Sequence, residues 1–323
     1  MNTAFVFSGQ GPFWPETGKD LFKKEQVFRH VIEECEYLIK RIGGWSLKDT
    51  LFLSKSDAKI DNTAIAQPAY FAFQVALFTL LQKKGFEPAA VIGHSTGEVA
   101  AAYCAGVMNL EDSIKVIYHR GRLMERLTGK GRMLWAKLFY EEAKKILVEY
   151  PGQEKVSICA VNEPSSTVFS GEVESIKNFY YYLLDLEIGA IELSFNYGFH
   201  CYLVDDLCPE LVSSLRGIKA SSHEIPIVST VEGTFLDGER FGEDYWSANI
   251  RNTVLFRFGI EALIEEGINN FVEISPRPLL LGSIDECLGY KDVEGLTLPT
   301  LDKGFNDFDV LNKSLKVLQT LAK

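Results

Sequence analysis

The stretch that decides the fold is Ala89-Ala90-Val91-Ile92-Gly93-His94-Ser95-Thr96-Gly97-Glu98. Its apolar first half is typical of a short buried strand, and the small residues from Val99 to Gly106 predict a helix after it. Gly-x-Ser-x-Gly between a strand and a helix is the pattern of a nucleophile elbow, in which glycines flank a turn too tight for larger residues. The turn lifts the serine hydroxyl clear of the sheet, and the free N–H groups at the helix start point toward it. We therefore predict that Ser95 is a nucleophile.

Outward from this stretch, short apolar runs alternate with segments of helical periodicity, which predicts an α/β fold. Residues 4–7 are expected to form a strand, and residues 64–83 a helix that ends at Gly85. The expected architecture is an α/β-hydrolase-like large domain built on a parallel sheet.

The middle of the chain has a different order of elements. We predict strands at 133–138, 156–161, 167–169 and 190–195, with a helix at 140–150 after the first strand and another at 174–185 after the third. That βαββαβ order is the order of a ferredoxin-like unit. We expect this small subdomain at 129–195, inserted between residues 1–128 and 196–323, which form the large subdomain. One continuous doubly wound sheet without an insertion is the alternative.

Composition narrows the class of partners. The 323 residues carry a net charge of −11 with a pI near 5.1, which argues against nucleic acid or an anionic membrane as a partner. The apolar start at residues 1–7 lacks a basic flank and reads as a strand, and no run approaches the ~18 apolar residues of a spanning helix. Six scattered cysteines without a CxxC pair favour a reduced, cytoplasmic protein. We expect no metal and no bound cofactor.

A serine nucleophile needs a base, and the chain has five histidines. His200 follows the turn Asn196-Tyr197-Gly198-Phe199 at the end of the inserted unit, where it would face Ser95 across a cleft. Residues 30, 119 and 223 lie in a charged helix, in a helix beside Arg120 and in a polar loop, and the side chain of His94 is expected to leave the elbow in another direction. We predict that His200 is the general base.

Several motifs extend the pattern along the chain: Phe7 to Gly11, Ala66 to Ala69, Gly93 to Glu98, Arg120 with Met124, Asn196 to His200, Tyr245-Trp246 with Asn249 and Arg251, and Phe271 to Pro276. In order and spacing this set resembles malonyl-CoA:acyl carrier protein transacylases. The likeness is stronger to the acyltransferase domains of modular polyketide synthases, through Gly11-Pro12-Phe13-Trp14 and residues 245–251. It covers residues 3 to about 290.

The resemblance implies roles for individual residues. Ser95 would be acylated, His200 would act as its base, and the backbone N–H groups of Gln10 and Thr96 would form the oxyanion hole. A backbone carbonyl near Val254 or Leu255, and not an acidic side chain, would orient the histidine.

The resemblance also implies how the substrate is held. Arg120 would grip the free carboxylate of a malonyl group, which suits a guanidinium because it offers two parallel donors. Gln67, His94, Asn162, Tyr197 and Phe199 would line the substrate pocket. Gln67 and Asn162 are equally interpretable as turn-capping amides, and His94 and Glu98 as scaffold.

The implied activity is transfer of a malonyl-type unit from malonyl-CoA, through a Ser95 ester, to the phosphopantetheine thiol of an acyl carrier protein of a polyketide or fatty-acid synthase. Because the chain starts at a methionine close to its first strand, we expect a free-standing enzyme acting in trans, with a domain excised from a longer synthase as the lesser alternative. Carrier proteins are acidic, so docking would need local cations, for which Arg122, Arg126, Lys130 and Arg132 are candidates.

Two departures from the family pattern concern the α-carbon of the donor. Tyr197-Gly198-Phe199-His200 lies between the His-Ala-Phe-His of malonyl-selective relatives and the Tyr-Ala-Ser-His of methylmalonyl-selective ones. Phe199 favours malonyl, whereas Tyr197 and the uncommon Thr96 leave a small polar substituent open. The alternatives are therefore an α-substituted unit from a carrier-bound donor, an acyl hydrolase that clears carrier proteins, and a catalytically idle docking module.

Overall fold

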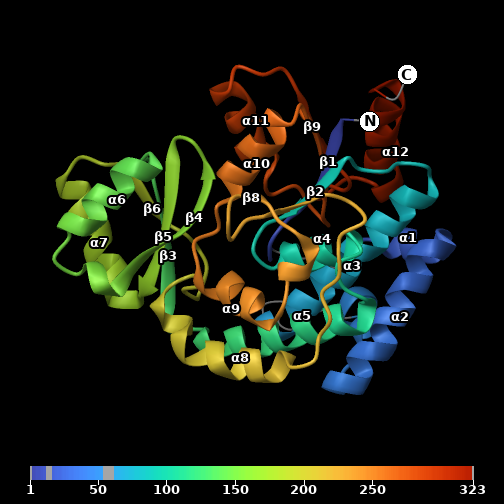
Figure 1. The fold of residues 1–323 in the computed structure, drawn as a ribbon, viewed down its shortest axis with the longest axis horizontal. Helices are drawn as coiled ribbons and strands as arrows, with labels where there is room; N and C mark the ends of the chain where they lie inside the picture. The colour runs from blue at the N-terminus through green and yellow to red at the C-terminus, as the bar shows by residue number, and fades with distance from the viewer. Residues whose placement is uncertain (1, 12–16, 54–61, 322–323) are drawn as a thin grey trace.

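The computed structural model describes residues 2–11, 17–53 and 62–321, and its two sheets lie side by side (Figure 1). The resemblance noted at Pro12-Phe13-Trp14 falls outside the described residues. The strands are β1 (Thr3–Phe7), β2 (Ala90–Gly93), β3 (Gly131–Ala136), β4 (Val156–Glu163), β5 (Ser166–Glu172), β6 (Ala190–Glu192), β7 (Ile227–Ser229), β8 (Thr234–Phe235), β9 (Asn270–Ile274) and β10 (Leu296–Pro299). The α-helices are α1 (Lys19–Lys24), α2 (Gln26–Gly43), α3 (Thr63–Lys83), α4 (Gly97–Cys104), α5 (Leu110–Met124), α6 (Tyr140–Glu149), α7 (Val173–Asp185), α8 (Cys208–Leu215), α9 (Glu243–Arg251), α10 (Phe256–Glu265), α11 (Leu281–Tyr290) and α12 (Asp307–Leu321).

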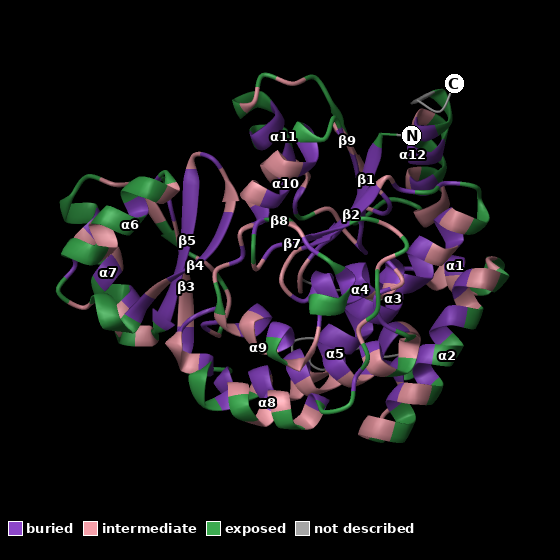
Figure 2. Cartoon of the chain, viewed as in Figure 1, coloured by how far each residue is buried: buried purple, intermediate pink, exposed green. Residues whose placement is uncertain are grey.

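The larger sheet has the order β10-β9-β1-β2-β7-β8 and is parallel except for the short β8. Its central strands are apolar on both faces because helices cover both faces. Phe5 and Phe7 pack into the cluster that contains α2 to α5, whereas Ala4 and Val6 pack against α10 and α11. Figure 2 accordingly shows β1 as buried. The predicted α/β fold with a parallel sheet is confirmed.

Register brings the functional segments together at one edge of this sheet. Phe7 at the end of β1 pairs with Gly93 at the end of β2 and with Ile274 at the end of β9. The segments that follow these strands therefore leave the sheet beside one another, at the carboxyl edge where α/β folds bind ligands.

Helix α3 is long and apolar enough to cross a membrane by composition, with a mean hydropathy of 1.5. However, 83% of its apolar window is buried inside the protein, against α2, α4 and α5. It is the central packing helix of the large unit.

The smaller sheet is antiparallel, with the order β4-β5-β3-β6, and appears in green at the left of Figure 1. Together with α6 and α7 it has the βαββαβ order and the strand arrangement of a ferredoxin-like unit. Two separate sheets exclude the alternative of one continuous sheet. The boundaries at 128/129 and 195/196 stay predictions, and β6 ends at Glu192, earlier than the expected residue 195.

Backbone hydrogen bonds join the two units. The Val161 N–H donates to the Val254 carbonyl, and the Val254 N–H donates to the Cys159 carbonyl, both at 2.9 Å. The Thr253 hydroxyl donates to the Ile158 carbonyl at 2.7 Å. Strand β4 is thus hydrogen-bonded to residues 253–254, which lead into α10.

Candidate active site

Ser95 occupies a sharp turn between β2 and α4, with a positive φ of 54°. The two flanking positions must be glycine because a Cβ at either would clash with neighbouring backbone atoms. A Cβ on Gly97 would lie 2.1 Å from the Phe7 carbonyl oxygen, and one on Gly93 would lie 2.3 Å from the Glu98 nitrogen. Those separations are far inside van der Waals contact, so the turn has the tight geometry of a nucleophile elbow.

The histidine chosen from the sequence lies against this serine. His200 Nε2 is 2.7 Å from Ser95 Oγ, and His200 Nδ1 is 2.9 Å from the Asn252 carbonyl oxygen. With the proton on Nδ1, that carbonyl accepts it and Nε2 is left to accept the serine proton.

The orienting carbonyl, expected near Val254 or Leu255, belongs to Asn252, two residues before Val254. The Val254 carbonyl accepts from the Val161 N–H, and the Leu255 carbonyl accepts from the Gly259 N–H. Asn252, which follows the end of α9, supplies the carbonyl that faces His200 Nδ1.

Burial, together with the smaller effects of the nearby Arg120 and His94, lowers the pKa of His200 to about 3. Only 4% of the residue is exposed, so its charged form is poorly solvated. The imidazole is consequently neutral at physiological pH, which is the form that can accept a proton.

Arg120 projects from α5 toward Ser95 and is 1% exposed. Its Nη1 donates to Gln67 Oε1 at 2.8 Å, its Nε to Asn249 Oδ1 at 3.0 Å and its Nη2 to Ser95 Oγ at 2.9 Å. Burial lowers the pKa of Arg120 to about 9, against the favourable charge of Glu98. The guanidinium is still a cation near neutral pH, and all three of these partners are neutral.

Beneath the elbow, Asn249 connects the arginine to a buried carboxylate. Its Nδ2 donates to Glu98 Oε2 and to the Ser95 carbonyl, while Tyr245 Oη and the Thr230 N–H donate to Glu98 Oε1. Burial raises the pKa of Glu98 to about 7, although these hydrogen bonds oppose the shift. Glu98 does not line the cavity beside Ser95, which fits its interpretation as scaffold.

The motif that contains Asn249 is visible in the sequence, whereas its bridging contacts are seen only in the structure. A signal for them existed, because Tyr245 and Asn249 are four residues apart and so share one face of α9.

A cavity of about 280 Å³ opens beside Ser95, between the two units. Arg120 and the expected pocket residues Gln67, His94, Asn162, Tyr197 and Phe199 all line it, as do Gln10 and Thr96. His94 Nε2 is 2.8 Å from Asn162 Oδ1, so these two side chains pair with each other. The smaller unit adds an apolar wall: Met133, Cys159, Ala160, Val168 and Leu193. The roles of these residues stay predictions.

Three aromatic rings continue that wall. The Tyr197 and Phe199 rings stack at 4.0 Å between centroids with an interplanar angle of 9°, and Phe195 also stacks on Tyr197 at 5.4 Å. They come from the chain after β6, because the shorter strand leaves residue 195 free to turn toward the cavity.

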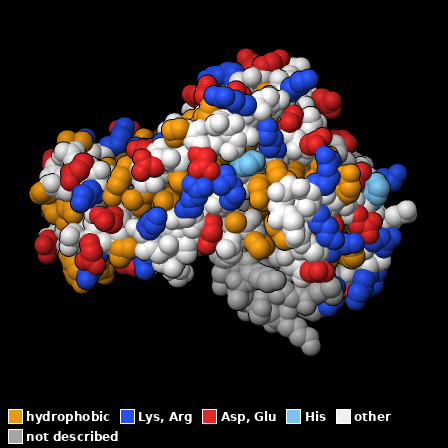
Figure 3. All heavy atoms as spheres, turned by 90° about the horizontal axis from the view of Figure 1, so that it is seen from below, with side chains coloured by type: hydrophobic (Ala, Val, Ile, Leu, Met, Phe, Trp, Pro, Cys, Tyr) orange, Lys and Arg blue, Asp and Glu red, His pale blue; other side chains and the backbone are white. Residues whose placement is uncertain are grey.

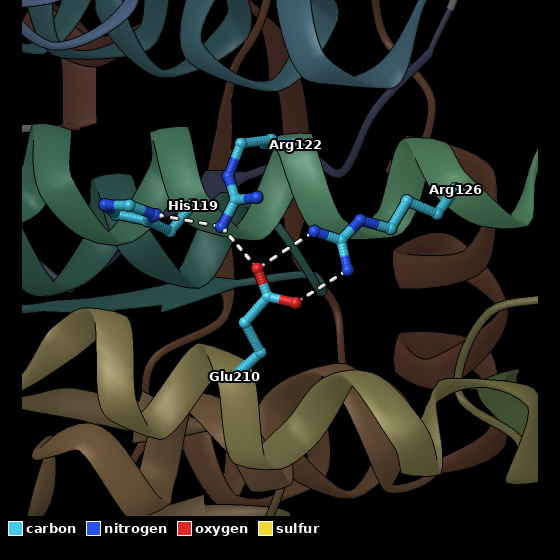
Figure 4. Close-up of polar contacts among 4 residues, drawn as sticks. All are labelled: His119, Arg122, Arg126 and Glu210. Carbon is cyan, nitrogen blue, oxygen red and sulfur yellow. Dashed lines mark hydrogen bonds and ion pairs between the residues drawn. The ribbon is translucent and has the colours of Figure 1, made fainter.

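The candidate docking cations are not equally available. Arg122 Nη2 and Arg126 Nη2 both donate to Glu210 Oε1 at 2.9 Å, and Arg126 Nη1 donates to Glu210 Oε2 at 2.6 Å. Figure 4 shows both arginines reaching from the α5 side to this one carboxylate on α8, with His119 alongside. Arg132 lies apart, 2.7 Å from Asn196 Oδ1. In the view from below, basic and acidic side chains are interspersed over this face (Figure 3).

Within the described residues, no group of three or more His, Cys, Asp or Glu side chains is placed to hold a metal ion.

Comparison with known proteins agrees with this geometry. A model of the acyl transferase domain family matches residues 4–321. The chain is 36% identical over 300 residues to spectinabilin polyketide synthase system protein NorC of Streptomyces orinoci, which covers 93% of this chain and 13% of that much longer protein.

Solved structures show the same fold. The acyltransferase domain from module 8 of the salinomycin polyketide synthase is 32% identical, with a TM-score of 0.92 over 97% of this chain and 74% of that one. A malonyl CoA-acyl carrier protein transacylase from Clostridium perfringens is 24% identical, with a TM-score of 0.88 over 99% of both chains, and supports the fold. A strand–turn–helix serine, an adjacent histidine and a family match over nearly its whole length lead to one conclusion: the chain belongs to the acyl transferase domain family.

Proposed function

We propose that this acyltransferase moves a malonyl-type unit from a thioester donor, with malonyl-CoA as the first candidate, through a Ser95 ester to the phosphopantetheine thiol of an acyl carrier protein. One observation carries the proposal. Ser95 Oγ lies 2.7 Å from a neutral histidine nitrogen and 2.9 Å from a buried guanidinium. A nucleophile, its base and a cation suited to a carboxylate therefore meet at one atom.

In the first half-reaction, Ser95 Oγ attacks the thioester carbonyl while His200 Nε2 takes the hydroxyl proton. The backbone N–H groups of Gln10 and Thr96 stabilise the oxyanion. When the C–S bond breaks, His200 gives its proton to the departing thiolate, which leaves as a thiol. The carrier's thiol then attacks the ester with the same proton transfers, and Ser95 is regenerated.

Arg120 selects donors that carry a free carboxylate. Gln67 and Asn249 hold its Nη1 and Nε, which fixes the plane of the guanidinium. The carboxylate replaces the serine hydroxyl as the acceptor at Nη2 once that hydroxyl is esterified, so the cation keeps a partner through the cycle. In the apolar cavity this charge pairing is stronger than in water.

Intact-mass spectrometry after incubation with malonyl-CoA, methylmalonyl-CoA or acetyl-CoA tests the proposal. We expect a malonyl adduct that is absent from Ser95→Ala and that passes to an added holo-carrier protein. Arg120→Ala should weaken malonyl loading while acetyl loading holds or rises. Equal losses for both donors would refute the carboxylate role.

The same experiment separates the alternatives. Release of free malonate in the absence of a carrier, at the rate of loading, would indicate a hydrolase. Loading only from a carrier-bound donor would indicate that the acyl unit does not arrive on coenzyme A. Absence of any adduct would indicate a docking module.

Action in trans on a separate synthase, and a cytoplasmic location where coenzyme A thioesters are made, stay predictions. The chain spans 13% of the length of the Streptomyces orinoci relative, so the synthase it serves is a further part of the proposal.

A further inference from the structure

Two polar atoms beside the nucleophile have no hydrogen-bond partner. The Thr96 hydroxyl is buried, as is the Gln10 side-chain oxygen Oε1, and neither is paired within the described chain. Thr96 stands at the N-cap of α4, but its helical backbone conformation leaves the hydroxyl without a cap hydrogen bond. Buried polar atoms are almost always paired, so an unpaired hydroxyl next to a reacting serine points to a group supplied by the substrate.

Both residues line the cavity that holds the acyl group. In the proposed ester, the α-carbon lies one bond from the carbonyl carbon on Ser95 and one bond from the carboxylate on Arg120. Its substituent therefore lies within a few ångströms of the residue that follows Ser95. The stacked rings of Tyr197 and Phe199 line the same cavity, and burial raises the pKa of the Tyr197 hydroxyl.

Resting on the proposed function, we infer that the structure assigns Thr96 and Gln10 as the specificity-determining residues for a hydroxyl group on the α-carbon of the donor. An α-hydroxyl donates to Gln10 Oε1 and accepts from the Thr96 hydroxyl, so both unpaired atoms become paired. The donor is then a hydroxymalonyl thioester.

Other substituents fit this subsite less well. A methyl group leaves both polar atoms unpaired and must pack against Phe199, which is 6% exposed. An ammonium group brings a second positive charge beside Arg120, which already reaches Ser95 at 2.9 Å.

The test compares donors of one length and one leaving group: the N-acetylcysteamine thioesters of malonate, methylmalonate and hydroxymalonate. The kcat/KM of Ser95 acylation is followed by intact mass for each donor. We expect the wild-type protein to prefer hydroxymalonyl over methylmalonyl by about tenfold or more. The informative quantity is this ratio within each variant, because it cancels any common change at the oxyanion hole.

Thr96→Val keeps the branched shape and removes the hydroxyl, so it should lower the ratio by about tenfold. Thr96→Ser keeps the hydroxyl and should retain most of the ratio. Gln10→Met, a second variant at a separate position, should also lower it. Thr96→Val should melt no lower than wild type, since the hydroxyl it loses bonds to nothing.

Each outcome decides the inference. An unchanged ratio in both Thr96→Val and Gln10→Met overturns it, as does a wild-type preference for methylmalonyl. Loading of malonyl without hydroxymalonyl overturns this inference but leaves the proposed function standing. Failure of all three donors to acylate Ser95 overturns both.

Discussion

The pH dependence of acylation should reveal the unusual state of His200. The base works only when neutral, so activity is present above its pKa and is lost below it. With a pKa of about 3, the imidazole is about 99% neutral at pH 5, whereas a histidine with the ordinary pKa of about 6.5 is about 3% neutral there. Acylation at pH 5 should therefore be close to its rate at pH 8, instead of falling about 30-fold.

The perturbation that tests the cause is Arg120→Gln. Burial is the largest cause of the low pKa and the Arg120 charge is the next, so removing that charge should raise the pKa while leaving it below the ordinary value. The acid limb of the profile should move to higher pH by the same amount.

The assay uses acetyl N-acetylcysteamine thioester, because a donor without a carboxylate does not need Arg120 for binding. Single-turnover kcat/KM is measured by intact mass between about pH 2.5 and 8, a range that contains a limb near pH 3, since kcat/KM reports the free enzyme. Arg240→Gln is the matched control: it removes an equal charge from an exposed ion pair with Glu232 and should leave the limb in place. A wild-type limb near pH 6.5, or a limb that moves to lower pH in Arg120→Gln, would refute the reasoning.

Three further results are expected. Asn249→Ala removes the donor to Glu98 and the acceptor for Arg120 Nε, so urea denaturation should show a free energy of unfolding lower by about 1–3 kcal/mol. Malonyl loading should also fall more than acetyl loading, and equal falls would contradict the bridging role. Because the pKa of Glu98 is raised, the folded state keeps a proton that the unfolded state has lost between pH 4.5 and 7. The free energy of unfolding should therefore fall by up to about 3 kcal/mol as pH rises through this range. Glu98→Gln should show a smaller fall with pH, and an identical fall in the variant would contradict this assignment. Glu210→Gln frees Arg122 and Arg126 and should lower the KM for an acidic carrier protein in steady-state transfer. Glu232→Gln makes the same change of charge at another ion pair and should leave this KM unchanged. Equal effects of the two variants would exclude this face as the docking site.

The elements that the sequence predicted are those whose cause is local. The elbow follows from two glycines that have no room for a Cβ, and that requirement is visible in five consecutive residues. The βαββαβ order follows from hydrophobic periodicity within about sixty residues, and the structure has the corresponding four-stranded sheet.

The features that escaped prediction depend on distant partners. The carbonyl that orients His200 belongs to Asn252, whereas the carbonyls of Val254 and Leu255 accept hydrogen bonds from Val161 and Gly259. Arg122 and Arg126 form a basic run in the sequence, yet Glu210, 84 residues beyond Arg126, offsets part of their charge. Neither arrangement can be predicted from the residues that are adjacent in the sequence.

The backbone seam between β4 and residues 252–254 has a mechanical consequence. Val254 is fixed to the smaller unit by two hydrogen bonds and Thr253 by a third, while Asn252, one residue earlier, holds the histidine. A rotation of the smaller unit that opened this seam would drag the Asn252 carbonyl with it and misalign the base. Any widening of the cavity that keeps the histidine aligned must therefore leave this seam closed and take place elsewhere along the boundary between the two units.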